Sequence, residues 1–88
     1  MNKELSFMDD GWDDYIYWQT ANKKVLKKIN DLLKDITRNP FSGIGKPEPL
    51  KHEKRGFWSR LINDEHRIVY RVEGNKTVIY SCKGHYDD

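Results

Sequence analysis

The pattern of hydrophobic and polar positions predicts a short strand and then a helix at the start of the chain. Residues 4–8 have the apolar content of a strand, and Asp9 or Asp10 then offers an N-cap. Trp12, Tyr15 and Ile16 follow at spacings of three and four residues, which places them on one face of a helix of about three turns.

The next segment carries the most regular helical pattern in the chain. Its apolar side chains recur every three or four residues and form one stripe, with lysines on the opposite side. The stripe consists of Val25, Ile29, Leu32, Leu33 and Ile36. Asn22 is placed to cap this helix, and Asn39 ends it because a residue that precedes proline avoids the helical conformation.

The second half of the chain has the pattern of an antiparallel meander. Glycines and prolines indicate a loop over residues 41–50. A polar turn at residues 63–65 and the hairpin signal Gly74-Asn75 then separate three strand-like runs. The runs span residues 57–62, 66–72 and 77–82.

Opposed residues of this meander predict which side chains share a face of the sheet. Four pairs define the expected register: Ile62 with Arg67, Arg60 with Val69, Val72 with Thr77, and Arg67 with Cys82. One face is then apolar, packs against the helices and carries Phe57, Leu61, Ile68, Tyr70, Val72 and Ile79. The other carries Arg60, Arg67, Arg71, Val69 and Tyr80. Because three arginines on one face repel each other unless an anion or water lies between them, this face is the candidate site.

Length and composition indicate one domain, residues 1–88, of the α+β class, with two N-terminal helices packed on a mainly antiparallel sheet. The hydrophobic share of 36% and the mean hydropathy of −0.94 are low. However, 3 Trp, 5 Tyr and 3 Phe are too many for a disordered chain. The single cysteine, Cys82, has no partner for an internal disulfide and no sequence signature of a nucleophile, so we expect a buried thiol.

Several function classes do not fit the sequence. No spacing of Cys and His suits zinc and no glycine-rich phosphate loop is present, so we expect neither a metal nor a cofactor. The apolar runs are too short to span a membrane, and the acidic start does not fit a signal peptide. Together with the lone cysteine, these features predict a cytoplasmic protein.

Charge is distributed unevenly, although the formal net charge is only +2. Residues 1–21 carry one Lys and five acidic residues, whereas residues 22–55 carry ten Lys or Arg and four acidic residues. Residues 56–88 carry five of each sign. The basic middle indicates a local anion site. A solvated helix face is the usual explanation of lysines on a helix, and it covers Lys23, Lys24, Lys27 and Lys28.

A few side chains could carry acid–base chemistry on a phosphate. Glu48 lies between two prolines, Arg67 lies within a strand, and His85 follows a glycine just past the last strand. A carboxylate can deprotonate a ribose 2′-OH, an arginine can stabilise a charged phosphorane, and a histidine can protonate the leaving oxygen. Each has an ordinary alternative: Glu48 could be a solvated loop carboxylate, Arg67 could form a structural salt bridge, and His85 could be a tail residue. His52 and His66, in or beside turns, are expected to be structural or solvated.

Five segments carry a resemblance to a known family. They are Trp12-Asp13-Asp14-Tyr15 with Trp18, residues 39–50 (NPFSGIGKPEPL), residues 56–60 (GFWSR), residues 65–70 (EHRIVY) and His85-Tyr86. In order and in spacing, they closely resemble the YoeB family of bacterial toxins, which belongs to the RelE superfamily of mRNA interferases. The resemblance covers nearly the whole chain.

The resemblance implies a RelE-like, microbial-ribonuclease-like fold and a toxin that cleaves mRNA in the ribosomal A site. It implies that Glu48 is the general base, Arg67 the residue that stabilises the phosphorane, and His85 the general acid. Three further positions match family residues that contact phosphate or RNA or that position the substrate, namely Lys51, Arg60 and Tyr86.

The resemblance also implies partners. A YefM-like antitoxin with an acidic, partly disordered C-terminal tail would neutralise the toxin, the ribosome and mRNA would be its targets, and operator DNA would be bound only through the antitoxin. The sequence leaves open whether the free toxin forms a homodimer. Two other functions fit the same basic surface: a non-catalytic inhibitor that binds RNA or the ribosome, and a DNA-binding co-repressor.

This chain departs from the family pattern at three places. Leu61 stands where many relatives have a second arginine, Lys83-Gly84 stands where relatives often have Arg-Tyr, and Asp87-Asp88 extend beyond the usual end. We expect these departures to alter efficiency and sequence preference rather than the class of reaction.

Overall fold

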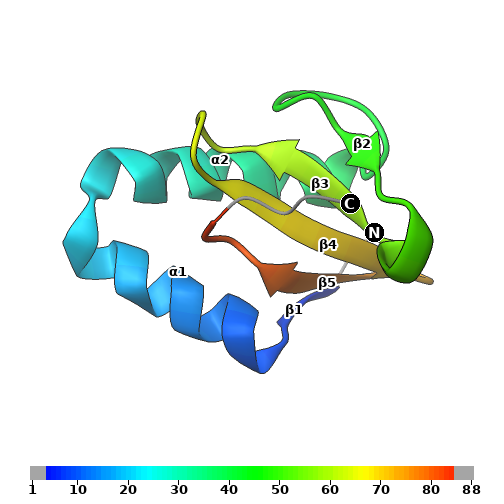
Figure 1. The fold of residues 1–88 in the computed structure, drawn as a ribbon, viewed down its shortest axis with the longest axis horizontal. Helices are drawn as coiled ribbons and strands as arrows, with labels where there is room; N and C mark the ends of the chain where they lie inside the picture. The colour runs from blue at the N-terminus through cyan, green and yellow to red at the C-terminus, as the bar shows by residue number, and fades with distance from the viewer. Residues whose placement is uncertain (1–3, 85–88) are drawn as a thin grey trace.

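A computed structural model describes residues 4–84 and confirms the predicted α+β class, with two N-terminal helices on a mainly antiparallel sheet (Figure 1). The helices are α1 (Asp9–Ala21) and α2 (Lys23–Arg38). The strands are β1 (Glu4–Phe7), β2 (Glu48–Pro49), β3 (Trp58–Leu61), β4 (Arg67–Glu73) and β5 (Lys76–Ser81). A short 3-10 turn, His52–Lys54, lies between β2 and β3.

The five strands form one sheet in the order β1-β5-β4-β3-β2. β1 pairs in parallel with β5 at one edge, and every other pair is antiparallel. The predicted meander therefore forms the centre of the sheet. The two-residue strand β2, at the other edge, lies within the segment predicted to be a loop.

The two helices begin differently. The Asn22 side chain caps α2 as predicted, because its Oδ1 accepts hydrogen bonds from the backbone N–H groups of Lys24 and Val25. The predicted aspartate cap of α1 is wrong, since Met8 precedes the first turn and no side chain caps it. Asp9 and Asp10 instead lie within that turn, where negative charge favours the helix dipole.

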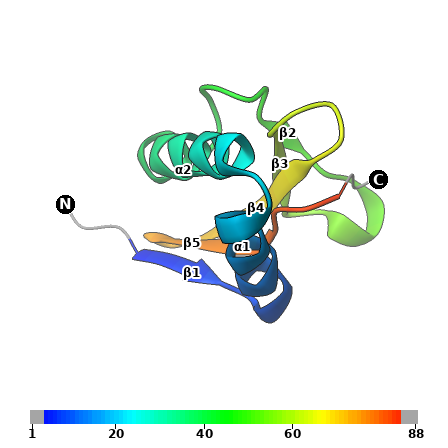
Figure 2. The same ribbon diagram turned by 90° about the vertical axis from the view of Figure 1, so that its left-hand side faces the viewer.

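The hydrophobic core lies between α2 and one face of the sheet. All five residues of the predicted stripe on α2 are buried, and they pack with Ile68, Tyr70 and Ile79 from the central strands. α1 adds Trp18 to the same core. Figure 2 shows α2 on one side of the sheet and the segment between β2 and β3 on the other.

The register between β3 and β4 differs from the prediction by one residue. Leu61 pairs with Arg67 and Arg60 pairs with Ile68. The turn explains the shift, because Asn63 Oδ1 accepts the backbone N–H groups of residues 65 and 66 and stabilises a three-residue connection rather than a two-residue one. A shift of one residue turns every side chain of a strand to the opposite face.

The register between β4 and β5 is partly as predicted. Val72 pairs with Thr77 at the Gly74-Asn75 turn, which confirms that hairpin. An irregularity between Val69 and Tyr70 then shifts the pairing by one residue. The predicted pairing of Arg67 with Cys82 is therefore wrong, and the Arg67 N–H donates to Gly84 O instead, at 3.0 Å.

Candidate active site on the open face of the sheet

The structure brings Glu48 and Arg67 together although 19 positions separate them in the sequence. Glu48 on β2 pairs with Ser59 on β3, and β3 pairs in turn with β4, whose first residue is Arg67. The Arg67 Nη1 lies 3.5 Å from Glu48 Oε1. The short strand β2 thus places a carboxylate beside a guanidinium on the sheet face opposite α2, which we call the open face.

The Arg67 side chain is held in place and only partly exposed. Its Nη1 also donates to Ser59 Oγ at 3.1 Å, and the Ser59 residue is fully buried. The Arg67 side chain is 20% exposed and the Glu48 side chain 63% exposed. The Arg67 Nε is buried without a hydrogen-bond partner among the residues described. This guanidinium therefore keeps unused donor capacity for a phosphate oxygen, and the solvent-accessible carboxylate beside it could accept a proton.

The backbone places Gly84 beside the same arginine. Gly84 O accepts the backbone N–H of Arg67, and Gly84 directly precedes His85 in the sequence. His85 and Tyr86, two of the predicted site residues, lie outside the described residues.

Arg60, predicted to share a face of the sheet with Arg67, does not lie on this face. The shifted register turns Arg60 toward α2, where the whole residue is fully buried. Its Nη1 donates to Asp35 Oδ2 at 2.5 Å, and its Nε donates to the Tyr70 hydroxyl at 3.2 Å. Three backbone carbonyls accept its remaining hydrogen bonds: those of Asn39, Ser42 and Ile44. Every guanidinium nitrogen of Arg60 is therefore engaged inside the protein.

Arg60 fixes the loop that leads to β2. It ties α2, through Asp35, to the loop carbonyls, and the Tyr70 hydroxyl adds a hydrogen bond to Pro40 O at 2.6 Å. The hydrogen bond from Arg60 holds the pKa of the Asp35 carboxyl below its usual range. Burial raises the pKa of Tyr70, so this hydroxyl stays protonated and can donate.

Lys51 lies close to β2 in sequence and is exposed. Its carbonyl accepts the Lys54 N–H in the 3-10 turn. Among the described residues, its side chain contacts neither Glu48 nor Arg67 through a hydrogen bond or an ion pair. Lys51 is therefore near Glu48 in sequence, but within the described part of the chain it makes no hydrogen bond or ion pair with Glu48 or Arg67.

A group of rings and cations on the open face was not predicted. The Lys54 Nζ lies 4.0 Å from the Tyr80 ring centroid, and the Arg71 guanidinium lies 5.3 Å from that of Phe57. The two rings meet edge to face at 5.5 Å. The predicted register placed Phe57 in the core, so it did not predict that Phe57 contacts Tyr80 and Arg71. Aromatic rings beside cations suit the bases and phosphates of single-stranded nucleic acid.

Cys82 is a buried thiol, as expected. Its Sγ lies 3.7 Å from Gly11 O, and burial raises the pKa of the thiol to about 12. At neutral pH the sulfur is therefore protonated and a poor nucleophile. α1 approaches β5 closely at this point, because a Cβ added to Gly11 would lie 2.5 Å from Ile79 O.

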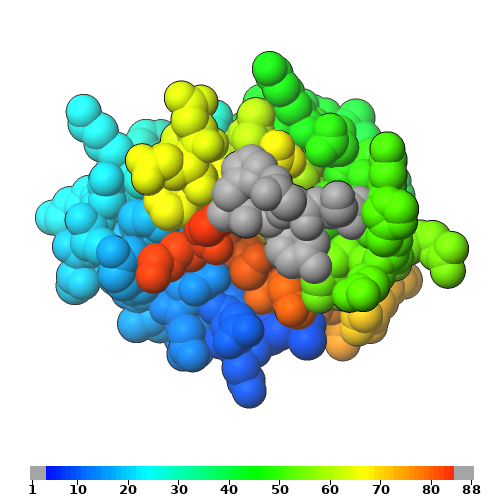
Figure 3. All heavy atoms as spheres, viewed as in Figure 1, coloured from blue at the N-terminus to red at the C-terminus, as the bar shows by residue number. Residues whose placement is uncertain are grey.

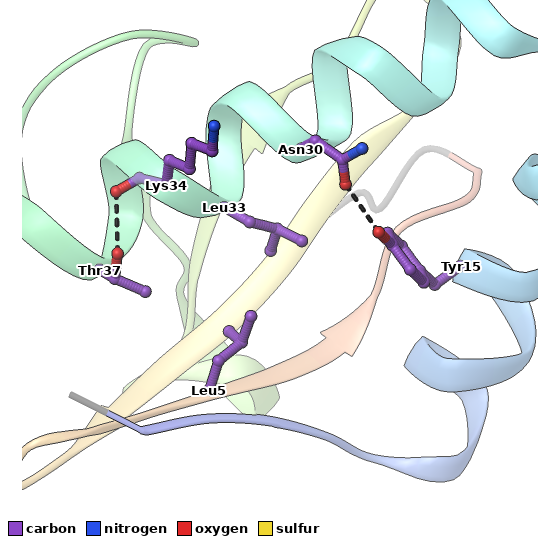
Figure 4. A pocket seen from close by; sticks show the side chains of 6 residues that line it. All are labelled: Leu5, Tyr15, Asn30, Leu33, Lys34 and Thr37. Carbon is purple, nitrogen blue, oxygen red and sulfur yellow. Dashed lines mark hydrogen bonds between the residues drawn. The ribbon is translucent and has the colours of Figure 1, made fainter. Parts of the chain in front are cut away.

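A separate pocket of about 370 Å³ lies between β1, α1 and α2 (Figure 4). Leu5 and Leu33 line it from two sides, and the Tyr15 hydroxyl donates to Asn30 Oδ1 at 2.7 Å beside it. None of the predicted site residues that the structure describes lines this pocket.

Two further structural features bear on function. Within residues 4–84, His, Cys, Asp and Glu side chains do not gather in groups of three or more that could hold a metal ion. Over the same residues, neither helix is long and apolar enough to cross a membrane.

Comparisons with known proteins point in one direction. A family model described as a YoeB-like toxin of bacterial type II toxin–antitoxin systems matches residues 7–86. Toxin YoeB of Escherichia coli (strain K12) is 53% identical over 83 residues, which make up 94% of this chain and 99% of that relative.

Solved structures agree with the sequence comparison. A YoeB dimer from Staphylococcus aureus superposes with a TM-score of 0.89 at 49% identity and covers 98% of this chain and 100% of its own. A YoeB–YefM complex from the same organism superposes with a TM-score of 0.88 at 50% identity and the same coverage.

Proposed function

The chain belongs to the YoeB-like toxins of bacterial type II toxin–antitoxin systems, and from this we propose that it is a ribosome-dependent endoribonuclease that cleaves mRNA in the A site. The observation that carries the proposal is the meeting of Glu48 and Arg67, 3.5 Å apart, at the point where Arg67 also binds the residue before His85. A base, an anion clamp and an acid are the groups that metal-free RNA cleavage requires.

The proposed reaction uses the ribose 2′-OH as the nucleophile. Glu48 takes its proton, and the oxygen attacks the adjacent phosphorus. Arg67 stabilises the negative charge that gathers on the nonbridging oxygens. The bond between phosphorus and the 5′-oxygen then breaks, and His85 donates a proton to that oxygen. The products are a 2′,3′-cyclic phosphate, which hydrolyses to a 3′-phosphate, and a 5′-hydroxyl.

Substrate binding would extend over the open face of the sheet. Lys51 would contact phosphate, and Tyr86 would position the nucleotide. Phe57 and Tyr80, with Lys54 and Arg71 beside them, offer a further surface for RNA. Because Arg60 is fully buried and fully hydrogen-bonded, we give it a structural role and none in RNA binding.

The proposed partners follow from the relatives. A YefM-like antitoxin would cover the basic face with an acidic tail and bind operator DNA, and this toxin would act in the cytoplasm, where ribosomes translate.

A homodimer is supported by the YoeB dimer of S. aureus and by Trp12, Ile16 and Tyr17 on α1, which are 50%, 48% and 47% exposed. Light scattering of the free protein tests this, and a monomer at micromolar concentration would contradict it.

Mapping of transcript 5′ ends after induction tests the cleavage. The wild type should produce new 5′-hydroxyl ends within translated codons, and Glu48→Gln, Arg67→Ala and His85→Ala should each lower cleavage by about 100-fold or more. The variants must keep their melting temperature and antitoxin binding. Continued cleavage by both Glu48→Gln and His85→Ala would refute the mechanism. Translation arrest without new ends in the wild type would indicate a non-catalytic inhibitor.

A further inference from the structure

The chain beyond β5 is held by both backbone polar groups of Gly84. Its N–H donates to His66 Nδ1 at 2.8 Å, and its carbonyl accepts the Arg67 N–H at 3.0 Å. The φ of Gly84 is +87°, a left-handed conformation that favours glycine, so the chain turns there. His66, just before β4, and Arg67, its first residue, thus fix the residue that precedes His85.

α1 holds the same segment two residues earlier. The Cys82 N–H donates to Asp14 Oδ2 at 2.9 Å, and the Cys82 carbonyl accepts Trp18 Nε1–H at 2.8 Å. In the space-filling view, the red segment that ends at Gly84 lies between α1 and the yellow turn before β4 (Figure 3). Four hydrogen bonds therefore hold residues 82 and 84 between two elements.

The His66 ring links the two elements. It packs edge to face against the Trp18 ring, with centroids 4.8 Å apart and an interplanar angle of 75°. The His66 backbone is held as well, because its N–H donates to Asn63 Oδ1 at 2.9 Å and its carbonyl accepts the Ile62 N–H at 2.9 Å. The imidazole is thus fixed with Nδ1 directed at the Gly84 N–H, which requires that this nitrogen carry no proton.

We propose that His66 is a positioning residue: its Nδ1 holds Gly84, and this fixes the point from which the chain continues to His85, the proposed general acid. The inference rests on the proposed function, in which His85 is the general acid. Glycine is the most flexible residue, so Gly84, which directly precedes His85, samples more backbone conformations without this bond. A general acid must lie within hydrogen-bond reach of the leaving oxygen, and a small displacement slows the reaction strongly.

Two substitutions at His66 separate the hydrogen bond from the ring contact. His66→Phe keeps an aromatic ring against Trp18 but cannot accept the Gly84 N–H. His66→Asn loses the ring but keeps an acceptor, because Asn Oδ1 is bonded to Cγ as His Nδ1 is. We expect His66→Phe to lower kcat for cleavage of mRNA on programmed ribosomes by about tenfold or more, with KM changed less than about twofold. His66→Asn should retain most of the kcat.

Amide hydrogen exchange gives a readout independent of activity. The Gly84 amide should exchange faster in His66→Phe than in the wild type and stay protected in His66→Asn. A wild-type kcat in His66→Phe, or an equal loss of kcat in both variants, would overturn the positioning role, as would unchanged exchange. Glu48→Gln and His85→Ala serve as separate controls. Cleavage that survives both would refute the proposed mechanism, in which His85 is the general acid, whereas cleavage lost in both and kept in His66→Phe would refute only this inference.

Discussion

Arg60 on β3 and Asp35 on α2 form an ion pair in the interior of the protein, with Nη1 and Oδ2 2.5 Å apart. The Arg60 side chain is fully buried and the Asp35 side chain is 22% exposed. Asp35 Oδ2 also accepts the Ile44 N–H at 3.0 Å, so the carboxylate binds both the sheet and the loop that leads to Glu48. This pair joins the hydrophobic core to the candidate active site.

Removal of the Asp35 charge should destabilise the fold strongly. Asp35→Asn leaves the Arg60 guanidinium buried without a counter-charge, which typically costs about 3–5 kcal/mol and lowers the melting temperature of a domain this size by more than about 10 °C. Asp31→Asn is the matched control, because Asp31 pairs with Lys27 at 3.1 Å on the surface, where such a pair contributes about 0.3–0.5 kcal/mol. Thermal unfolding of both variants checks this, and equal melting temperatures would contradict it.

Asp35 should also make the fold sensitive to acid. The pKa of its carboxyl is lowered below 3.8 in the folded protein, chiefly by the hydrogen bond from Arg60. The stability that this carboxylate contributes is therefore fully present above about pH 4 and is lost as the pH falls through the folded pKa. Urea unfolding between pH 7 and pH 2.5 measures the free energy of unfolding of wild type and Asp35→Asn, and the difference between the two should decrease at the acid end. A difference that stays constant with pH would rule out this linkage.

The elements of this fold other than β2 could be predicted from the sequence because each has a local signal. The stripe from Val25 to Ile36 and the cap at Asn22 define α2 without reference to the rest of the chain. β2 could not be predicted, since a strand of two residues that includes Pro49 has no hydrophobic period. It forms because β3 offers it a partner.

The faces of the sheet were harder to predict, and the candidate site depends on them. One extra residue in the turn around Asn63 moves Arg60 from the open face into the core. The preference of Asn for turns was visible in the sequence, but the length of the turn was not. The turn beside His66 predicts a structural or solvated residue. Its contact with Gly84 could not be predicted, because it spans 18 positions and has no local signature.

Asp14 should behave in the opposite way to Asp35. Burial raises the pKa of its carboxyl above 3.8, so the folded state disfavours the charged form at neutral pH, and this cost disappears as the pH falls below the folded pKa. Asp14→Asn removes the charge and keeps an oxygen that accepts the Cys82 N–H. We expect Asp14→Asn to have a melting temperature at pH 7 equal to or above that of the wild type. Any increase in melting temperature should be lost near pH 3. A lower melting temperature at pH 7 would contradict this account.

Arg71 should contribute to substrate binding and not to chemistry. It lies on the same face of β4 as Arg67, beside the Phe57 ring, and it pairs with Glu73 and not with Glu48 among the described residues. Arg71→Ala removes one cation that could contact a phosphate, so KM for programmed ribosomes should rise about three- to tenfold with kcat unchanged. The slope of log affinity against log salt should fall by about one. Lys27→Ala, on α2 at 77% exposure, removes the same charge on the other side of the sheet and should change neither quantity. Equal effects of the two substitutions would show that only net charge matters.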